Sequence, residues 1–213
     1  MPPVERFVCR FAAEPPQEAL PHGAWAQTLQ AEFLAACLRV DDDGEDIGEA
    51  RELRYFPDRT WNGRTYVPIT ARTTTELELF GYVSFRPGDP DATGEDSEPS
   101  DFVSGADFTG ETAERNPDWK IDLCEEVIGT WRGEGGRGAE MTLVWGVPLI
   151  AGARVATGEL AGLAVDQCAL VEDRFSLIAP DAYRSDYLDV KLWDADGREL
   201  ASESLYVDDE EEE

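Results

Sequence analysis

Three glycines past the middle of the chain match a pattern that binds phosphates. Gly133, Gly135 and Gly138 lie in WRGEGGRG with the spacing G-x-G-x-x-G. In dinucleotide-binding proteins this pattern follows a strand and opens a helix, whose N-terminus faces the pyrophosphate. Here AEMTLVWGVPLI (139–150) follows, and its β-branched, aromatic and proline residues disfavour a helix. We therefore expect a flexible hairpin between two strands and no nucleotide site.

Other catalytic or metal-binding patterns are also missing. The only histidine, His22, is not linked by any motif to a nucleophile, and no serine lies in G-x-S-x-G. The acidic stretch 41–49 departs from a calcium-binding EF-hand loop, because Asp46 stands where that loop requires glycine. We name no catalytic residue, no cofactor and no metal ligand. The sequence favours a protein that is not an enzyme over an enzyme of unrecognised type.

The four cysteines are Cys9, Cys37, Cys124 and Cys168, and none forms C-x-x-C. Their apolar neighbours indicate buried, reduced thiols, with two disulfides as an alternative. A zinc site would show paired short spacings. The first residues lack the apolar segment of a secretory signal, and no apolar run is long enough to span a membrane. We expect a cytoplasmic protein.

The charge of the chain is extreme. It has 46 acidic and 18 basic residues, for a net charge of −28, and only Lys120 and Lys191 are lysines. Such a surface repels nucleic acid, so we expect no nucleic-acid partner. Three interpretations remain open: a surface adapted to molar salt, a basic protein partner, or mimicry of DNA. The excess of acidic residues over lysine resembles haloarchaeal proteins as a class.

The periodicity of apolar residues predicts one helix and many strands. In AWAQTLQAEFLAACLRV (24–40), Trp25, Leu29, Phe33 and Cys37 share one helical face. Asn62-Gly63 predicts a tight hairpin, because both central residues of a type I′ turn need positive φ. A second hairpin turn is expected at 194–197. The other expected strands are 4–13, 51–56, 76–85, 141–150, 153–160, 165–172, 174–180, 187–193 and 199–207, with 121–131 as a strand or a short helix.

These elements predict a mainly β (α+β) fold, an antiparallel barrel or sandwich with one amphipathic helix near the N-terminus. We expect one integrated domain with four parts. Residues 1–86 form a β-rich region with the helix, and 87–118 form an acidic loop or linker rich in proline and glycine. Residues 119–207 form an antiparallel β region, and 208–213 form an acidic tail. The loop or interface candidates are Phe102, Phe108 and Trp119.

One short segment carries a family resemblance. GTWRGEG (129–135) resembles the opening strand of nitrobindins, and Gly129-x-Trp131 is similar to the Gly-x-Trp of lipocalin-type barrels. The resemblance implies a β-barrel in which a tryptophan closes one end. Nitrobindins bind haem through a late histidine, and here no histidine follows His22, so the resemblance does not extend to His-ligated haem.

The sequence as a whole favours a non-enzymatic binding or assembly component of a halophile, with a protein partner or a homo-oligomer. The missing catalytic residues, the long acidic segment and the strand aromatics support this hypothesis. One alternative is a barrel that binds a small apolar ligand, with Trp131, Trp145 and Trp193 as the candidate ligand-binding residues. The other is a DNA-mimic inhibitor of a basic protein.

Overall fold

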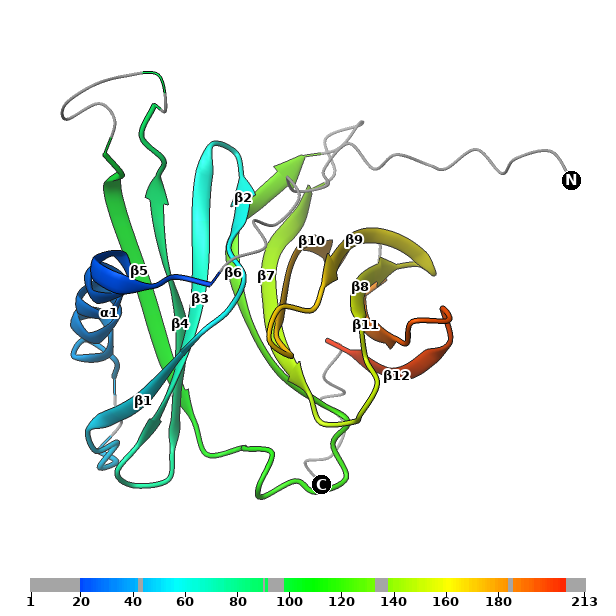
Figure 1. The fold of residues 1–213 in the computed structure, drawn as a ribbon, viewed down its shortest axis with the longest axis horizontal. Helices are drawn as coiled ribbons and strands as arrows, with labels where there is room; N and C mark the ends of the chain where they lie inside the picture. Colours follow the sequence, from blue (N-terminus) through cyan, green and yellow to red (C-terminus); the bar gives the residue numbers. More distant parts are fainter. Residues whose placement is uncertain are drawn as a thin grey trace, which may run out of the picture.

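A computed structural model of the chain describes residues 20–41, 44–89, 91, 98–132, 138–183 and 186–205, which form one helix and twelve strands. The strands form three antiparallel sheets that follow one another from α1 to the C-terminal part of the chain (Figure 1). The strand expected at 4–13 and the tail expected at 208–213 lie outside the described residues.

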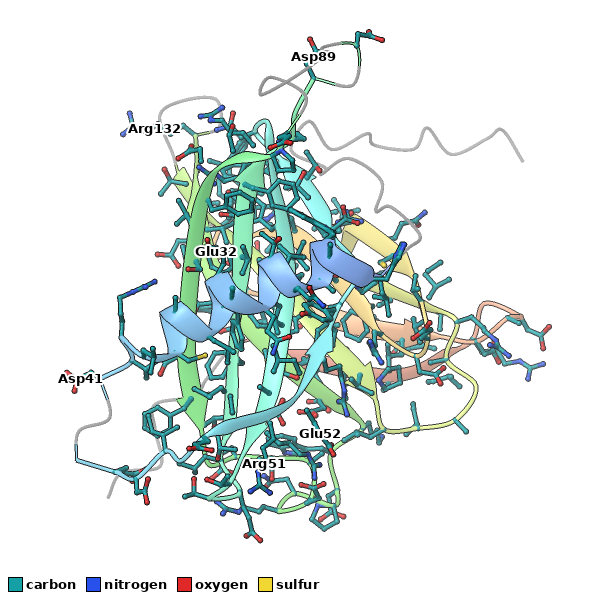
Figure 2. All side chains as sticks on the ribbon, turned by 60° about the vertical axis from the view of Figure 1, so that its left-hand side comes forward. Glu32, Asp41, Arg51, Glu52, Asp89 and Arg132 are labelled. Atoms are coloured by element: carbon teal, nitrogen blue, oxygen red, sulfur yellow. The ribbon has the colours of Figure 1, made fainter. Side chains whose placement is uncertain are left out.

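The helix α1 covers the outer face of the first sheet. It spans Gly23–Cys37, which confirms the amphipathic helix predicted near the N-terminus. Its residues Leu29, Phe33 and Ala36 are buried, and it contacts β5 and β4. Figure 2 shows α1 crossing in front of this sheet. The ring of Trp25 also meets that of Phe85 edge to face, with 4.9 Å between the ring centroids.

The first sheet, here called sheet A, has the order β1-β3-β4-β5, and β2 pairs with β3. Its strands are β1 (Ala50–Tyr55), β2 (Arg59–Trp61), β3 (Arg64–Thr73), β4 (Glu78–Arg86) and β5 (Ser100–Thr109). The hairpin between β2 and β3 turns at Asn62 and Gly63, whose φ angles are 52° and 71°. Both angles are positive, as the Asn-Gly pair predicts.

The other two sheets are formed by the second half of the chain. Sheet B has the order β10-β7-β6, and sheet C has the order β12-β11-β8-β9. The strands of sheet B are β6 (Ile121–Arg132), β7 (Gly138–Pro148) and β10 (Phe175–Asp181). Those of sheet C are β8 (Val155–Leu160), β9 (Leu163–Ala169), β11 (Leu188–Trp193) and β12 (Glu199–Ser204). Sheet B is the middle layer, because side chains on its two faces pack toward sheet A and toward sheet C.

Three apolar clusters hold these layers together. The first lies between α1 and sheet A, where Leu29 and Phe33 meet Val67 and Ile69. The second lies between sheets A and B and contains Phe56, Tyr66, Met141, Leu143, Trp145 and Ile178. The third lies between sheets B and C and includes Val144, Phe175, Leu177, Leu188 and Val190. Alternate residues of β7 and β10 therefore belong to different clusters, as the period of a strand requires.

The predicted fold class is confirmed, and the sandwich is the form it takes. None of the three sheets built from the described residues closes into a barrel. The segment 121–131, which we expected as a strand or a short helix, belongs to strand β6. Within 87–118, where we expected a loop or linker, the structure places β5. Its residues Phe102 and Phe108 pack against the cluster beneath α1, which explains why this acidic segment forms a strand.

A buried ion pair connects the three layers. Nη2 of Arg59, on β2, lies 2.5 Å from Oδ2 of Asp166, on β9, and the Arg59 side chain has no exposed surface. Asp166 also accepts a hydrogen bond from the backbone N–H of Ile178, on β10, at 2.8 Å. Nearby, Arg174 donates to the carbonyl of Tyr55 at 2.9 Å, and the Ser176 hydroxyl donates to the carbonyl of Pro57. These contacts attach the segment between β1 and β2 to sheets B and C.

We predict that Asp166→Asn strongly destabilises the protein. The substitution leaves the Arg59 guanidinium buried without a carboxylate, and breaking a buried pair in this way costs about 3–5 kcal/mol. For a domain of this size the melting temperature should fall by roughly 10 °C. The matched control is Asp196→Asn in the exposed pair with Arg198, where the loss should stay below about 1 kcal/mol. Equal shifts in the two variants, measured by thermal unfolding, would contradict the role assigned to the buried pair.

Candidate functional site

The glycine-rich segment connects two adjacent strands. β6 and β7 pair in antiparallel register as far as Arg132 and Gly138, so the strands predicted on both sides of the glycines are confirmed. Residues 133–137 lie outside the described part of the chain. A strand, β7, follows the glycines, and the helix N-terminus that would bind a pyrophosphate is not at this position.

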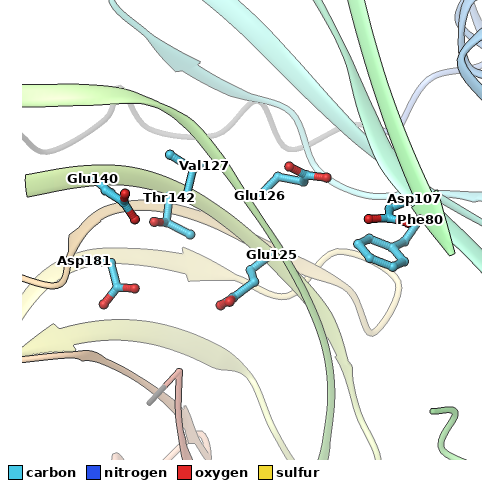
Figure 3. A pocket seen from close by; sticks show the side chains of 8 residues that line it. All are labelled: Phe80, Asp107, Glu125, Glu126, Val127, Glu140, Thr142 and Asp181. Carbon is cyan, nitrogen blue, oxygen red and sulfur yellow. The ribbon is translucent and has the colours of Figure 1, made fainter. Parts of the chain in front are cut away.

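A hollow of about 350 Å³ lies along β6 and is lined mainly by acidic side chains. We call it the acidic groove. It includes five carboxylates, which come from strands β5, β6, β7 and β10 (Figure 3). The lining residues are Phe80, Asp107, Glu125, Glu126, Val127, Glu140, Thr142 and Asp181.

Strand register places one part of the groove on the face of sheet B that is turned toward sheet C. Glu125 pairs with Val144, whose side chain belongs to the cluster between these two sheets. Val127 pairs with Thr142, two residues before Val144, so the side chains of Val127 and Thr142 lie on the same face. Glu140 pairs with Asp181 on this face as well. The face is covered by sheet C only in part, and its acidic end is left open.

The other part of the groove lies on the opposite side of β6. Glu126 pairs with Leu143, whose side chain packs between sheets A and B. Phe80 and Asp107 pair across β4 and β5 in sheet A, and Phe80 packs toward the same layer. In Figure 3, Glu126, Asp107 and Phe80 form one group, apart from Glu125, Glu140, Thr142 and Asp181. Because β6 is an edge strand of sheet B, the groove extends around the outer edge of this strand.

A bulge shapes β6 at the groove. The register with β7 shifts between Val127 and Gly129, which places an extra residue in β6 and increases its twist. A Cβ at Gly129 would lie 2.8 Å from the ring of Trp61, so the close approach of sheet A requires glycine here. The bulge therefore bends β6 where Glu125, Glu126 and Val127 line the groove.

The groove is strongly negative. Among the described residues, no arginine or lysine forms an ion pair with any of its five carboxylates. The pKa of Glu125 is raised to about 7 by partial burial, with added repulsion from Asp181 and Glu126. Burial also raises the pKa of Glu126, and the charge of Asp107 adds to this effect. Asp181 is held in place by a hydrogen bond from the backbone N–H of Leu188 at 2.8 Å.

One polar group in the groove lacks a hydrogen-bond partner. The hydroxyl of Thr142 is buried, with 2% of the residue exposed, and its oxygen has no donor or acceptor within reach. Figure 3 shows this oxygen pointing to the side on which Glu140 and Asp181 lie. A buried hydroxyl normally finds a partner, so this group marks a position where a donor from a bound molecule would be accommodated.

The groove carboxylates are spread out and do not converge on one point. In the part of the chain that the structure covers, no three His, Cys, Asp or Glu side chains lie close enough together to hold a metal ion. Separated carboxylates instead suit an organic cation that carries several N–H donors, such as an ammonium or guanidinium group.

The three candidate tryptophans lie in different places. Trp131, on β6, is half-buried and meets Tyr183 at a ring-centroid distance of 5.7 Å. Trp145, on β7, is fully buried between sheets A and B and lies behind Phe80 of the groove, 6.4 Å away. Trp193, on β11 of sheet C, donates a hydrogen bond from Nε1 to the Thr157 hydroxyl at 2.8 Å. None of the three is among the residues that line the groove.

The residues predicted at a loop or interface also lie in different places. Phe102 and Phe108 are half-buried on β5, beneath α1. Trp119 lies just before β6, where its backbone N–H donates to the carbonyl of Asn116 at 3.1 Å.

Sequence reasoning missed the groove residues, because the many acidic residues of the chain hide any particular pair. The adjacent Glu125 and Glu126 inside an apolar strand were the one available signal.

The described cysteines, Cys37, Cys124 and Cys168, are free thiols. Burial raises the pKa of each, to about 11 for Cys37 and well above the usual value for Cys124. Thiols of this kind react slowly, because the thiolate is the reactive form. Cys9 lies outside the described residues.

No family model, curated protein or solved structure matches this chain. Within the described residues, no helix combines the length and the apolar character needed to cross a membrane. The function is therefore inferred from the geometry of the groove.

We predict that Glu125→Gln stabilises the protein at high pH only. The folded-state pKa of Glu125 is raised to about 7, so above pH 7 the folded protein holds a carboxylate that would be more stable in the unfolded chain. As the pH falls from 7 toward the ordinary glutamate value, the wild type binds this proton in the folded state and the advantage of the variant disappears. Because Glu125 is only partly buried, solvent screening limits the gain at pH 8 to about 1 kcal/mol, or ~3 °C.

Thermal unfolding between pH 4 and pH 9 measures this effect, with Glu49→Gln at an exposed position outside the groove as the control. A gain for Glu125→Gln that is the same at pH 4.5 and pH 8 would show that burial of the charge is not its cause.

Proposed function

We propose that this protein is a non-enzymatic binding component that recognises a basic partner protein through the acidic groove. The observation that carries the proposal is the gathering of five carboxylates around one edge strand, with no described basic side chain among them. Charges of one sign are placed together at a cost in stability, and a binding function explains such a cost.

The surroundings of the groove suit a lysine-rich or arginine-rich segment. Glu126 and Asp181 lie half-buried, where a charge-assisted hydrogen bond is stronger than on an open surface, while Asp107, Glu125 and Glu140 are exposed to a partner. Phe80 and the half-exposed Val127 offer apolar surface for the aliphatic part of a basic side chain. The open edge of β6 lets a partner approach both sides of the strand.

We further propose that the protein works in the cytoplasm of a halophile. The net charge of −28 and the scarcity of lysine support this environment. At ~1 M salt the Debye length is about 3 Å, so distant carboxylates neither repel one another nor attract a partner. Recognition then depends on direct contacts, which the neighbouring carboxylates of the groove can make.

The two alternative functions fit the groove less well. An apolar ligand would have to remove several carboxylates from water without supplying donors to them, which is unfavourable. A DNA mimic needs carboxylates spaced like phosphates along an extended face. The groove gathers its carboxylates around one short stretch of β6, and this favours a short basic segment of a partner.

We predict that neutralising the groove weakens the binding of a basic peptide. The probe is a fluorescein-labelled peptide of alternating lysine and alanine, and fluorescence anisotropy at 0.15 M and 1 M KCl gives its affinity. Removal of three groove charges should lower the affinity at least tenfold, since each charged hydrogen bond contributes about 1.5–3 kcal/mol. The groove variant carries the substitutions Glu125→Gln, Glu126→Gln and Glu140→Gln.

A control variant removes the same charge from exposed glutamates outside the groove and should change the affinity less than twofold at 1 M KCl. Its substitutions are Glu49→Gln, Glu76→Gln and Glu98→Gln. If the two variants weaken binding equally, the peptide responds to net charge, and the groove is not the binding site.

A further inference from the structure

The unpaired hydroxyl of Thr142 limits what the groove can bind. Carboxylates only accept hydrogen bonds, whereas a threonine hydroxyl can accept one and donate one. Thr142 lies on the same face of sheet B as Glu125, Glu140 and Asp181. A molecule that satisfies the Thr142 hydroxyl and the carboxylates beside it must supply several donors and a positive charge.

Apolar surface lies beside these polar groups. Val127 is directly opposite Thr142 in the pairing of β6 with β7, and half of its side-chain surface is exposed. The exposed part of Val127 can cover the methylene groups of a ligand, as apolar surface does for long basic side chains. The volume of the groove, about 350 Å³, lies at the small end of the range for ligand sites.

We propose that Thr142, Glu140 and Asp181 form a socket for one alkylammonium group, with Glu125 beside them on the same face of sheet B, and that the group is supplied by a lysine side chain or by a free diamine. This inference rests on the proposed function and names the chemical group that the groove recognises. An ammonium has three donors that diverge from one nitrogen, so it can bind the Thr142 hydroxyl and two carboxylates at once. The Thr142 oxygen is itself buried, so the proposed binding requires rotation about χ1 to turn it toward the groove.

The geometry favours ammonium over the other cations. A bare metal ion needs ligands that converge, and the carboxylates of the described residues do not. A guanidinium presents a flat fork that is matched by the two oxygens of one carboxylate. Here Glu140 and Asp181 are cross-strand neighbours on β7 and β10, and Thr142 lies two residues from Glu140 on the same face, so two carboxylates and one hydroxyl are brought together. A compact point charge suits that arrangement better than a planar one.

The test compares Thr142→Val with Thr142→Ser in the full chain. Isothermal titration calorimetry at pH 8 measures the binding of Nα-acetyl-lysine amide, 1,5-diaminopentane and Nα-acetyl-arginine amide. Thr142→Val removes a buried hydroxyl that has no partner, so the melting temperature of the free protein should rise or stay unchanged. The same substitution should weaken binding of the preferred ammonium probe about tenfold, while Thr142→Ser keeps the hydroxyl and should stay within threefold of the wild type.

The preferred probe identifies the source of the ammonium. Tighter binding of Nα-acetyl-lysine amide indicates a protein side chain, and tighter binding of 1,5-diaminopentane indicates a free polyamine. Affinity should also fall as the pH drops through 7, because Glu125, whose pKa is about 7, loses its charge there.

Three results would overturn the socket. They are an unchanged affinity in Thr142→Val, an affinity that Thr142→Ser fails to retain, and tighter binding of the arginine probe than of either ammonium probe. These results separate the two proposals. If the groove variant loses the lysine–alanine peptide but Thr142→Val does not affect the ammonium probes, the basic-partner function stands and the socket is wrong. If the groove variant and its control bind the peptide equally, the proposed function itself is wrong.

Discussion

The ion pair between Arg59 and Asp166 is the constraint on which the arrangement of the three sheets depends. A buried guanidinium needs a carboxylate to balance its charge, and here that carboxylate comes from another sheet and contacts Nη2, while Nε and Nη1 of Arg59 are buried without a partner. Burial raises the pKa of Asp166, while the charge of Arg59 opposes the shift. The pair therefore places β2 of sheet A against β9 of sheet C, next to β10 of sheet B.

The acidic groove follows from that position. Sheets A and B are joined through the segment before β2 and through the cluster around Trp145, and the edge strand β6 lies beyond this cluster. Glu126 on one face of β6 and Glu125 on the other are thus brought near carboxylates of different strands. Their mutual repulsion and partial burial disfavour ionisation, as the raised pKa values show. This unfavourable free energy is confined to the groove and does not affect the contacts that join the three sheets.

The sequence predicted the local features well. The helical face of Leu29 and Phe33, the Asn62-Gly63 turn and the strands on both sides of the glycine-rich segment are set by near neighbours in the chain. The groove was not predictable in this way, because it depends on which strands pair and in what register. Composition alone made β5 look like a loop, and its packing under α1 overrode the proline and glycine residues around it. The burial of Arg59 left no signal in the sequence, since its partner is 107 residues away.

In the molar salt that we propose as the environment of this protein, net charge alone cannot select a partner, and the groove gives some of the carboxylates a separate role. At molar salt an exposed carboxylate attracts a cation only at contact, and its hydration competes with binding. A partly buried carboxylate is less hydrated, so a cation that enters the groove displaces less water and interacts more strongly. The same burial makes the carboxylates less stable when no cation is bound. A site of this kind can therefore distinguish a partner that fits it from the many small cations around the rest of the surface, which net charge alone cannot do.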